Sequence, residues 1–278
     1  MDLFNIFQQI EKIDPEVYNK LDTRRHAMKQ FTNISGKIAL AAIPFALGSM
    51  FNKTYARQAT GTSVKEVLSL ALTLEYLEAA FYKKGLETTG LIPAEGIGAI
   101  TTISNHETAH VKFLQNVLSG MGGFAASPTF DFTAGGTFAT VFSNYDLFLA
   151  LSQAFEDTGV RAYKGQAIYL AGSGDVLTAA LNIHSVEARH AAHIRSMRRS
   201  RNKLGAETVD LRPWITLKQS GIATSAVDPV YAGEETTVQA NVNISAINNM
   251  GDKNASESFD EPLTGAQAVA IASLFIKS

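Results

Sequence analysis

The chain has 278 residues, 46% of them hydrophobic, which is enough for one or two domains with a full core. Its formal net charge of -2 creates no overall field that would attract nucleic acid or an anionic membrane. Because the chain has no cysteine, disulfides, thiol catalysis and cysteine-ligated zinc or iron–sulfur sites are excluded. Any metal must therefore be held by Glu, Asp and His.

The N-terminal segment has the features of an export signal. Residues 38–51 are apolar and uncharged, and this stretch is shorter than the about 20 residues that span a bilayer. The upstream Thr23-Arg24-Arg25 resembles a twin-arginine signal, and a small-residue cleavage site ends at Ala56. We therefore expect residues 1–57 to be an export leader, with a periplasmic mature chain that has no stable membrane span. The alternative is an N-terminal helix of a cytoplasmic protein.

Apolar residues recur with helical spacing in four later segments, and glycine or proline separates them. The connection at residues 120–143 is long and rich in Gly and Thr, whereas the other two connections are short. Two short hairpins joined by one long crossover are typical of the ferritin-like bundle. The sequence thus predicts an all-α, ferritin-like four-helix bundle at residues 62–201. Its helices are expected at residues 62–87, 94–119, 144–172 and 175–201.

Residues 202–278 form a C-terminal extension rich in Thr, Ser, Asn and Gly for most of its length. This composition predicts a largely irregular tail, with short strands at most, that packs on the bundle. From Thr264 to Phe275 the chain becomes apolar and alanine-rich, which predicts a short final helix docked on the bundle. Trp214, which follows Pro213, is expected to anchor the tail.

Each predicted helix carries a carboxylate in the middle of its apolar stripe. A buried carboxylate without a partner costs several kcal/mol or takes up a proton, so four at one level are unfavourable as simple packing. Around bound cations the same four carboxylates are favourable. The residues are Glu75, Glu107, Glu156 and Glu187.

Two of these carboxylates begin a Glu-x-x-His motif, in which both side chains share one helix face. The histidines are His110 and His190. A Glu from each of two helices, with Glu-x-x-His from each of the other two, is the pattern of di-iron and di-manganese carboxylate proteins. The two hairpins also repeat one another, because Tyr82 and Tyr163 each follow the first glutamate of their hairpin by seven residues.

Other polar residues lie close to this pattern. Glu78 is on the inner face, either as an extra ligand or as a carboxylate that hydrogen-bonds to the ligands. His106 and His193 are expected to point away from the ligand face, in solvated or structural roles. His184 is either structural or close to the ligands. Tyr82 and Tyr163 either pack or tune the ligands.

Residues 62–200 resemble the ferritin-like proteins often called desiccation-related. The resemblance is carried by the segments Leu74–Tyr82, His106–His110, Phe155–Gly159 and Val186–His190. Two tail segments, at residues 231–234 and 258–263, are also similar to that group.

The resemblance implies a role for each residue of the predicted centre. Two glutamates would be terminal ligands, namely Glu75 and Glu156. Two others would bridge the metals, namely Glu107 and Glu187. His110 and His190 would each bind one metal. Tyr82 and Tyr163 would lie directly behind the ligands.

We therefore expect two iron or manganese ions, with oxygen or peroxide as substrate, in a possible small homo-oligomer. The expected activity is oxidation of ferrous ion or removal of peroxide in stress protection. One alternative is a non-catalytic stress or envelope protein on a ferritin-like scaffold. Another is an iron-storage cage, although the tail would have to fit within a shell.

Overall fold

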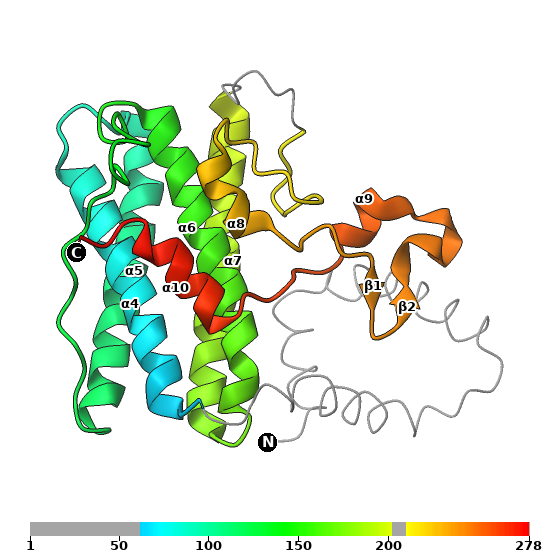
Figure 1. Cartoon of the computed structure of the whole chain (residues 1–278). Helices are drawn as coiled ribbons and strands as arrows, with labels where there is room; N and C mark the ends of the chain where they lie inside the picture. The colour runs from blue at the N-terminus through cyan, green and yellow to red at the C-terminus, as the bar shows by residue number, and fades with distance from the viewer. Residues whose placement is uncertain (1–61, 202–209, 278) are drawn as a thin grey trace, which may run out of the picture. The chain divides into compact units, whose positions relative to one another are not determined.

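A computed structural model describes residues 62–201 and 210–277. Four long helices form a bundle, as the sequence predicts (Figure 1). Their bounds are α4 Val64–Glu87, α5 Ala94–Ser119, α6 Tyr145–Gln166 and α7 Gly174–Arg201. The predicted third helix ends early, because its last turn tightens into the 3-10 helix η1, Ala167–Leu170. The predicted export leader at residues 1–57 lies outside the described residues.

The helix ends follow local side-chain chemistry. Ser63 and Glu66 form a reciprocal capping box at the start of α4. The side chain of Asn144 accepts hydrogen bonds from the backbone amides of Asp146 and Leu147, which begins α6. These caps satisfy amide groups that have no partner inside the helix.

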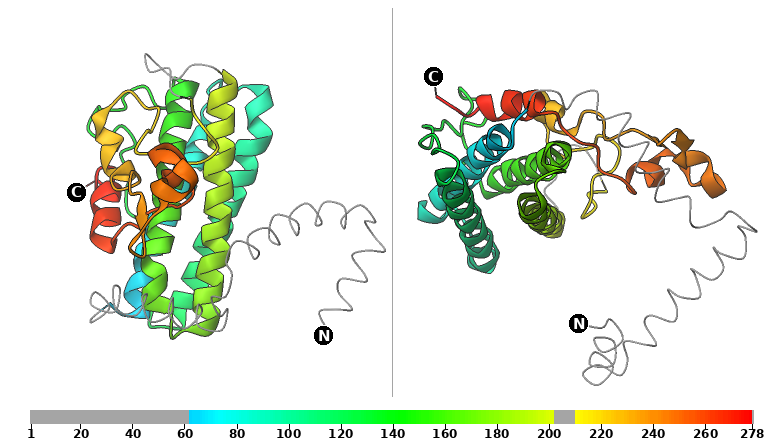
Figure 2. Two further views of the ribbon diagram at one scale, coloured as in Figure 1. Left: turned by 90° about the vertical axis from the view of Figure 1, so that its right-hand side faces the viewer. Right: turned by 90° about the horizontal axis from the view of Figure 1, so that it is seen from below.

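The helices pack as two hairpins, α4 with α5 and α6 with α7, joined by a crossover along the bundle (Figures 1 and 2). The crossover buries Phe132 and Phe138 in the core. Its backbone also pairs with the C-terminal segment, since the amide of Asp131 donates to the carbonyl of Phe275 at 2.7 Å. The all-α bundle with one long crossover is thus confirmed.

The tail consists of short elements joined by irregular chain, as expected. They are η2 Ser225–Val227, α8 Asp228–Tyr231, β1 Val238–Gln239, β2 Val242–Asn243, η3 Ile244–Asn249, α9 Gly251–Ser256 and α10 Gly265–Ser273. The predicted final helix is α10, and it packs on α4 and α6. Trp214 is 46% exposed, so the expected anchor is wrong; Leu211 and Ile215 are buried instead.

Buried polar contacts fasten this tail to α6. Arg161 donates to the carbonyl oxygens of Val230, Ala232 and Glu261, and its Nε lies 2.7 Å from Oε1 of Glu234. Along the described residues, no helix is long and apolar enough to cross a membrane.

Candidate metal centre

The six predicted ligand side chains come together inside the bundle. Their ligand atoms form two groups, each with all atoms within 4.8 Å of one another. The first group contains Glu75, Glu107, His110 and Glu187. The second contains Glu107, Glu156, Glu187 and His190. Two glutamates, Glu107 and Glu187, belong to both groups, and all four glutamates are fully buried.

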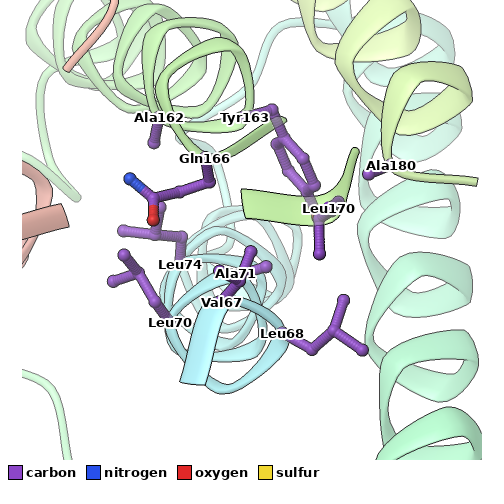
Figure 3. Close-up of a pocket in the computed structure, with 10 residues that line it drawn as sticks. All are labelled: Val67, Leu68, Leu70, Ala71, Leu74, Ala162, Tyr163, Gln166, Leu170 and Ala180. Carbon is purple, nitrogen blue, oxygen red and sulfur yellow. The ribbon is translucent and has the colours of Figure 1, made fainter. Parts of the chain in front are cut away.

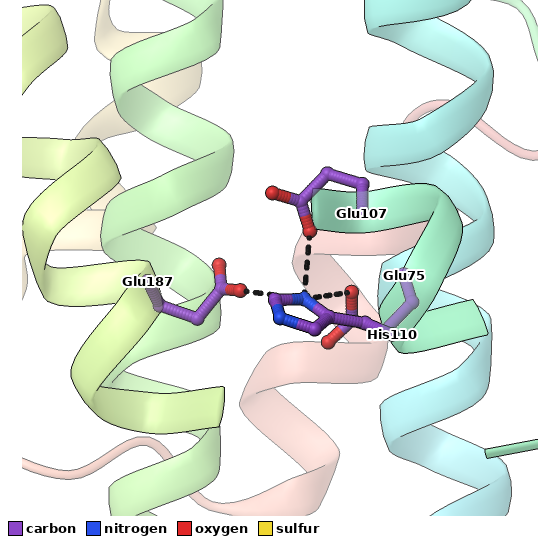
Figure 4. Close-up of side chains that lie close together, drawn as sticks. All are labelled: Glu75, Glu107, His110 and Glu187. Atoms are coloured by element: carbon purple, nitrogen blue, oxygen red, sulfur yellow. Dashed lines mark hydrogen bonds and ion pairs between the residues drawn. The ribbon is translucent and has the colours of Figure 1, made fainter. Parts of the chain in front are cut away.

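One imidazole nitrogen is the centre of the first group (Figure 4). Nδ1 of His110 lies 3.2 Å from Oε2 of Glu75, 3.1 Å from Oε2 of Glu107 and 3.3 Å from Oε1 of Glu187. A single N–H cannot be directed at three acceptors. Two ligands at right angles on a cation, each about 2.1 Å from it, lie about 3 Å apart. The spacing therefore suits four ligands around one ion.

The second group repeats the arrangement on the other hairpin. Nδ1 of His190 lies 2.8 Å from Oε1 of Glu107 and 3.2 Å from Oε2 of Glu156. Each histidine thus faces the outer glutamate of its own hairpin, and both histidines also face Glu107, which belongs to both groups. The residues could hold two cations that have two carboxylates in common.

Three of the four oxygens of the carboxylates that belong to both groups lack a well-directed hydrogen bond. Both oxygens of Glu187 and Oε1 of Glu107 are buried, and no described residue donates a well-directed hydrogen bond to them. Carboxylate oxygens left this way inside a protein are strongly destabilising. Coordination of a cation would satisfy them, so the donor set fits a pair of metal ions.

Without a cation the site holds protons. Burial is the largest cause of the raised pKa of Glu75, about 7, and of Glu187, about 8. Burial alone would lower the pKa of each histidine, but the neighbouring carboxylates outweigh it. They raise the pKa of His110 to about 12 and that of His190 to about 10. Metal binding would therefore release protons from this centre.

Two tyrosines hold the outer carboxylates from the opposite hairpin. Tyr163 of α6 donates to Oε1 of Glu75 at 2.6 Å, and Tyr82 of α4 donates to Oε1 of Glu156. Burial, followed by the adjacent carboxylates, raises the pKa of both hydroxyls, so they remain protonated donors. Both tyrosines thus contact predicted ligands in addition to packing.

A small cavity of about 10 Å³ lies beside Tyr163 (Figure 3). Its walls are mostly apolar and include Leu68, Ala71, Leu170 and Ala180. An ordered water needs several polar partners, and only Tyr163 and Gln166 carry polar side chains in these walls. This side of the centre is therefore closed by apolar packing.

Glu78 is buried next to the centre but lies in neither ligand group. Burial, and then four neighbouring carboxylates, raise its pKa well above the usual value. Its counterpart on α6, three residues after Glu156, is Gly159. A β-carbon built on Gly159 would lie 2.8 Å from Oε2 of Glu187 and 3.3 Å from Oε1 of Glu78. The glycine therefore leaves room for both carboxylates.

The orientation expected for one histidine was wrong. His106 was expected to point away from the ligands, but its Nδ1 lies 2.9 Å from Nε2 of His190. Burial, followed by His190, lowers the pKa of His106. His193 is exposed, as expected. Of the two alternatives for His184 the structure supports the structural one, because its Nδ1 lies 3.0 Å from the carbonyl oxygen of Val160.

Comparison with known families identifies part of the chain. Residues 63–200 match the family model described as the ferritin-like domain. No match was found among curated proteins or solved structures. The matched region spans all four bundle helices and all six predicted ligands.

Proposed function

Because residues 63–200 form a ferritin-like domain, we propose that the protein binds two iron or manganese ions and oxidises ferrous ion or removes peroxide. The observation that carries the proposal is the pair of overlapping, buried Glu/His groups in that domain. We further propose that the activity protects against stress, as the resemblance to desiccation-related proteins implies.

Each part of the proposed centre has its own task. Terminal ligands would be Glu75 and Glu156, which the two tyrosines orient. Glu107 and Glu187, which belong to both ligand groups, would hold both ions; three of their four oxygens lack a well-directed hydrogen bond. His110 and His190 would bind one ion each through Nδ1.

When bound, two redox-active ions supply a two-electron exchange with dioxygen or peroxide. Carboxylates and imidazoles suit both iron and manganese, so availability in the compartment would select between the metals. The apolar walls beside Tyr163 exclude water on one side of the centre. The tyrosine hydroxyls remain protonated and orient the oxygens of Glu75 and Glu156 that they contact.

The test compares metal content and turnover of the wild type with those of Glu107→Ala/Glu187→Ala. Plasma mass spectrometry should find near two iron or manganese ions per chain in the wild type and loss of both in the variant. Peroxide removal or oxygen-dependent ferrous oxidation should disappear with them. The matched control, Glu87→Ala/Glu235→Ala, removes two exposed carboxylates and should change neither property. Full turnover in the first variant would overturn the proposal.

A structural role in the envelope is the second candidate. It is favoured by the extent of the buried polar contacts that fasten the tail to α6, because such fastening stabilises a scaffold without serving catalysis. In that case metal removal would lower thermal stability, but no turnover would exist to be lost. Size-exclusion chromatography separates both candidates, expected as monomer to small homo-oligomer, from an iron-storage cage.

We also propose export to the periplasm, on the basis of the twin-arginine-like pattern and apolar stretch before residue 57. Cell fractionation with Arg24→Lys/Arg25→Lys tests this proposal. Retention of the variant in the cytoplasm, with the wild type in the periplasm, supports it. A wild-type protein found in the cytoplasm supports the alternative location.

A further inference from the structure

The two halves of the candidate centre differ in what stands behind the histidines. Nε2 of His190, the ring nitrogen that faces away from the carboxylates, lies 2.9 Å from Nδ1 of His106. The two ring planes make an angle of 16° and the ring centroids lie 5.2 Å apart, so the rings meet edge to edge at these two nitrogens. His106 is exposed on α5, whereas His190 is 5% exposed on α7. The contact therefore joins the two hairpins and connects the buried histidine to the surface.

The hydrogen bond determines which nitrogen of His190 carries the proton. Nδ1 faces Glu107 and Glu156, so a bound cation would take its lone pair and leave the proton on Nε2. Nε2–H then donates to Nδ1 of His106, whose own proton is on Nε2. A partner of this kind fixes both the tautomer and the ring orientation of a metal ligand.

A groove explains how an imidazole is accommodated at this position. An open cavity of about 440 Å³ runs between α5 and α7, and His106, His190 and His193 contribute to its walls. These walls contain no carboxylate, and His106 is exposed in the groove. Solvent can therefore accept from its Nε2–H while its Nδ1 faces His190.

The other hairpin has no equivalent residue. His106 immediately precedes Glu107, whereas Val186 immediately precedes Glu187. A valine side chain can neither accept nor donate a hydrogen bond. The internal repeat is therefore broken here, on the His190 side of the centre, as it is also broken where Gly159 stands in place of Glu78.

We propose that His106 is a positioning residue for His190 and makes the two metal positions unequal. The inference rests on the di-metal site put forward under the proposed function. Removal of a hydrogen-bond partner behind a metal ligand typically weakens metal binding 10- to 100-fold. This loss should affect the His190 position alone.

The experiment titrates metal-free protein with Co²⁺, which carboxylate and imidazole sites bind more tightly than Mn²⁺ or Fe²⁺. Calorimetry and visible absorption follow the two binding steps. In His106→Ala one step should weaken about 10- to 100-fold while the other stays within about twofold. His106→Gln, whose amide oxygen can accept the same hydrogen bond, should recover most of the lost affinity. His193→Ala, in the same groove, is the matched control and should bind as the wild type does.

A double-mutant cycle identifies the position that is affected. In a His190→Ala background, adding His106→Ala should cause no further loss of Co²⁺ affinity. Equal weakening of both steps, unchanged binding in His106→Ala or a further loss in that background would overturn the inference. If the wild type binds no Co²⁺ at all, the proposed function fails and the inference fails with it. If the wild type binds two ions and His106→Ala leaves both affinities unchanged, the inference fails while the proposed function stands.

Discussion

Tyr163 on α6 donates a 2.6 Å hydrogen bond to Glu75 on α4, and the reciprocal bond runs from Tyr82 on α4 to Glu156 on α6. Each hairpin thus orients the outer carboxylate of the other. Because both hydroxyls are buried, neither bond is exchanged for one to water. The two-fold repeat seen in the sequence is therefore a repeat of contacts as well as of residues.

Removing either hydroxyl should weaken metal binding without unfolding the bundle. Tyr163→Phe and Tyr82→Phe should each lower the affinity for Mn²⁺ about tenfold, because the released carboxylate must be ordered on binding. Calorimetric titration measures the change. Tyr76→Phe is the control, since it removes a hydroxyl that contacts Gln115 and Ala125 outside the centre. Wild-type affinity in Tyr163→Phe would show that the hydrogen bond to Glu75 does not organise the site.

The metal-free protein should lose thermal stability as pH rises from about 5 to 9. Burial raises the pKa of Glu75 to about 7 and that of Glu187 to about 8. The folding stability that these two carboxyl groups contribute is therefore fully present below pH 4.5 and is lost as the pH rises through about 7 and 8. His110 and His190 have raised pKa values of about 12 and 10, and their contribution is lost as pH rises above 6.5. Both effects have the same sign because the folded state holds the extra protons.

Scanning calorimetry in the presence of a chelator measures this trend. Added Mn²⁺ should act in the opposite direction, with an increase in melting temperature that grows with pH as the ligands release protons. Glu187→Gln removes one titrating carboxylate and should give a shallower decline. A melting temperature that rises from pH 5 to 9 in the chelated wild type would contradict the prediction.

Much of the fold and the ligand set could be predicted because local signals were strong. Asn144 caps α6, and the long glycine-rich connection separates two hairpins with short links. A carboxylate in an apolar helical stripe is unfavourable without a partner, which identified Glu107 and Glu187 before any geometry was known. These arguments depend on spacing within one helix.

Contacts between elements could not be predicted in the same way. His106 is one residue from Glu107, about 100° around the helix axis, so the sequence pattern directed it away from the site. It reaches His190 only because α5 and α7 approach one another there. Likewise, Asp157 pairs with Arg195 and accepts from Tyr231 of the tail, 74 residues away, and no periodicity signals that contact.

The ion pair between Arg161 and Glu234 should be essential for tail docking. Both side chains are buried, and burial raises the pKa of Glu234 to about 7 even with its partner present. Arg161→Met leaves this carboxylate without a counter-charge and should destabilise the fold by about 3–5 kcal/mol. Adding Glu234→Gln should recover part of the loss. Urea unfolding measures both variants.

An exposed ion pair is the control for this prediction. Lys83 pairs with Glu87 on the surface of α4, with side chains 68% and 62% exposed. Lys83→Met should change the free energy of unfolding little, because solvent screens such pairs. Equal effects of Arg161→Met and Lys83→Met would show that the tail does not depend on the buried pair.

Gly159→Ala should uncouple the stability of the bundle from its ability to bind metal. Alanine favours a helix over glycine by roughly 0.5–1 kcal/mol, yet the new β-carbon would lie 2.8 Å from Oε2 of Glu187. That carboxylate belongs to both ligand groups, so its displacement should weaken both metal positions together. Gly98→Ala on α5 is the matched control, because its β-carbon meets nothing within 4 Å. It should gain the helical stabilisation and retain both ions, whereas two tightly bound ions in Gly159→Ala would show that the space beside Glu187 is not needed for the centre.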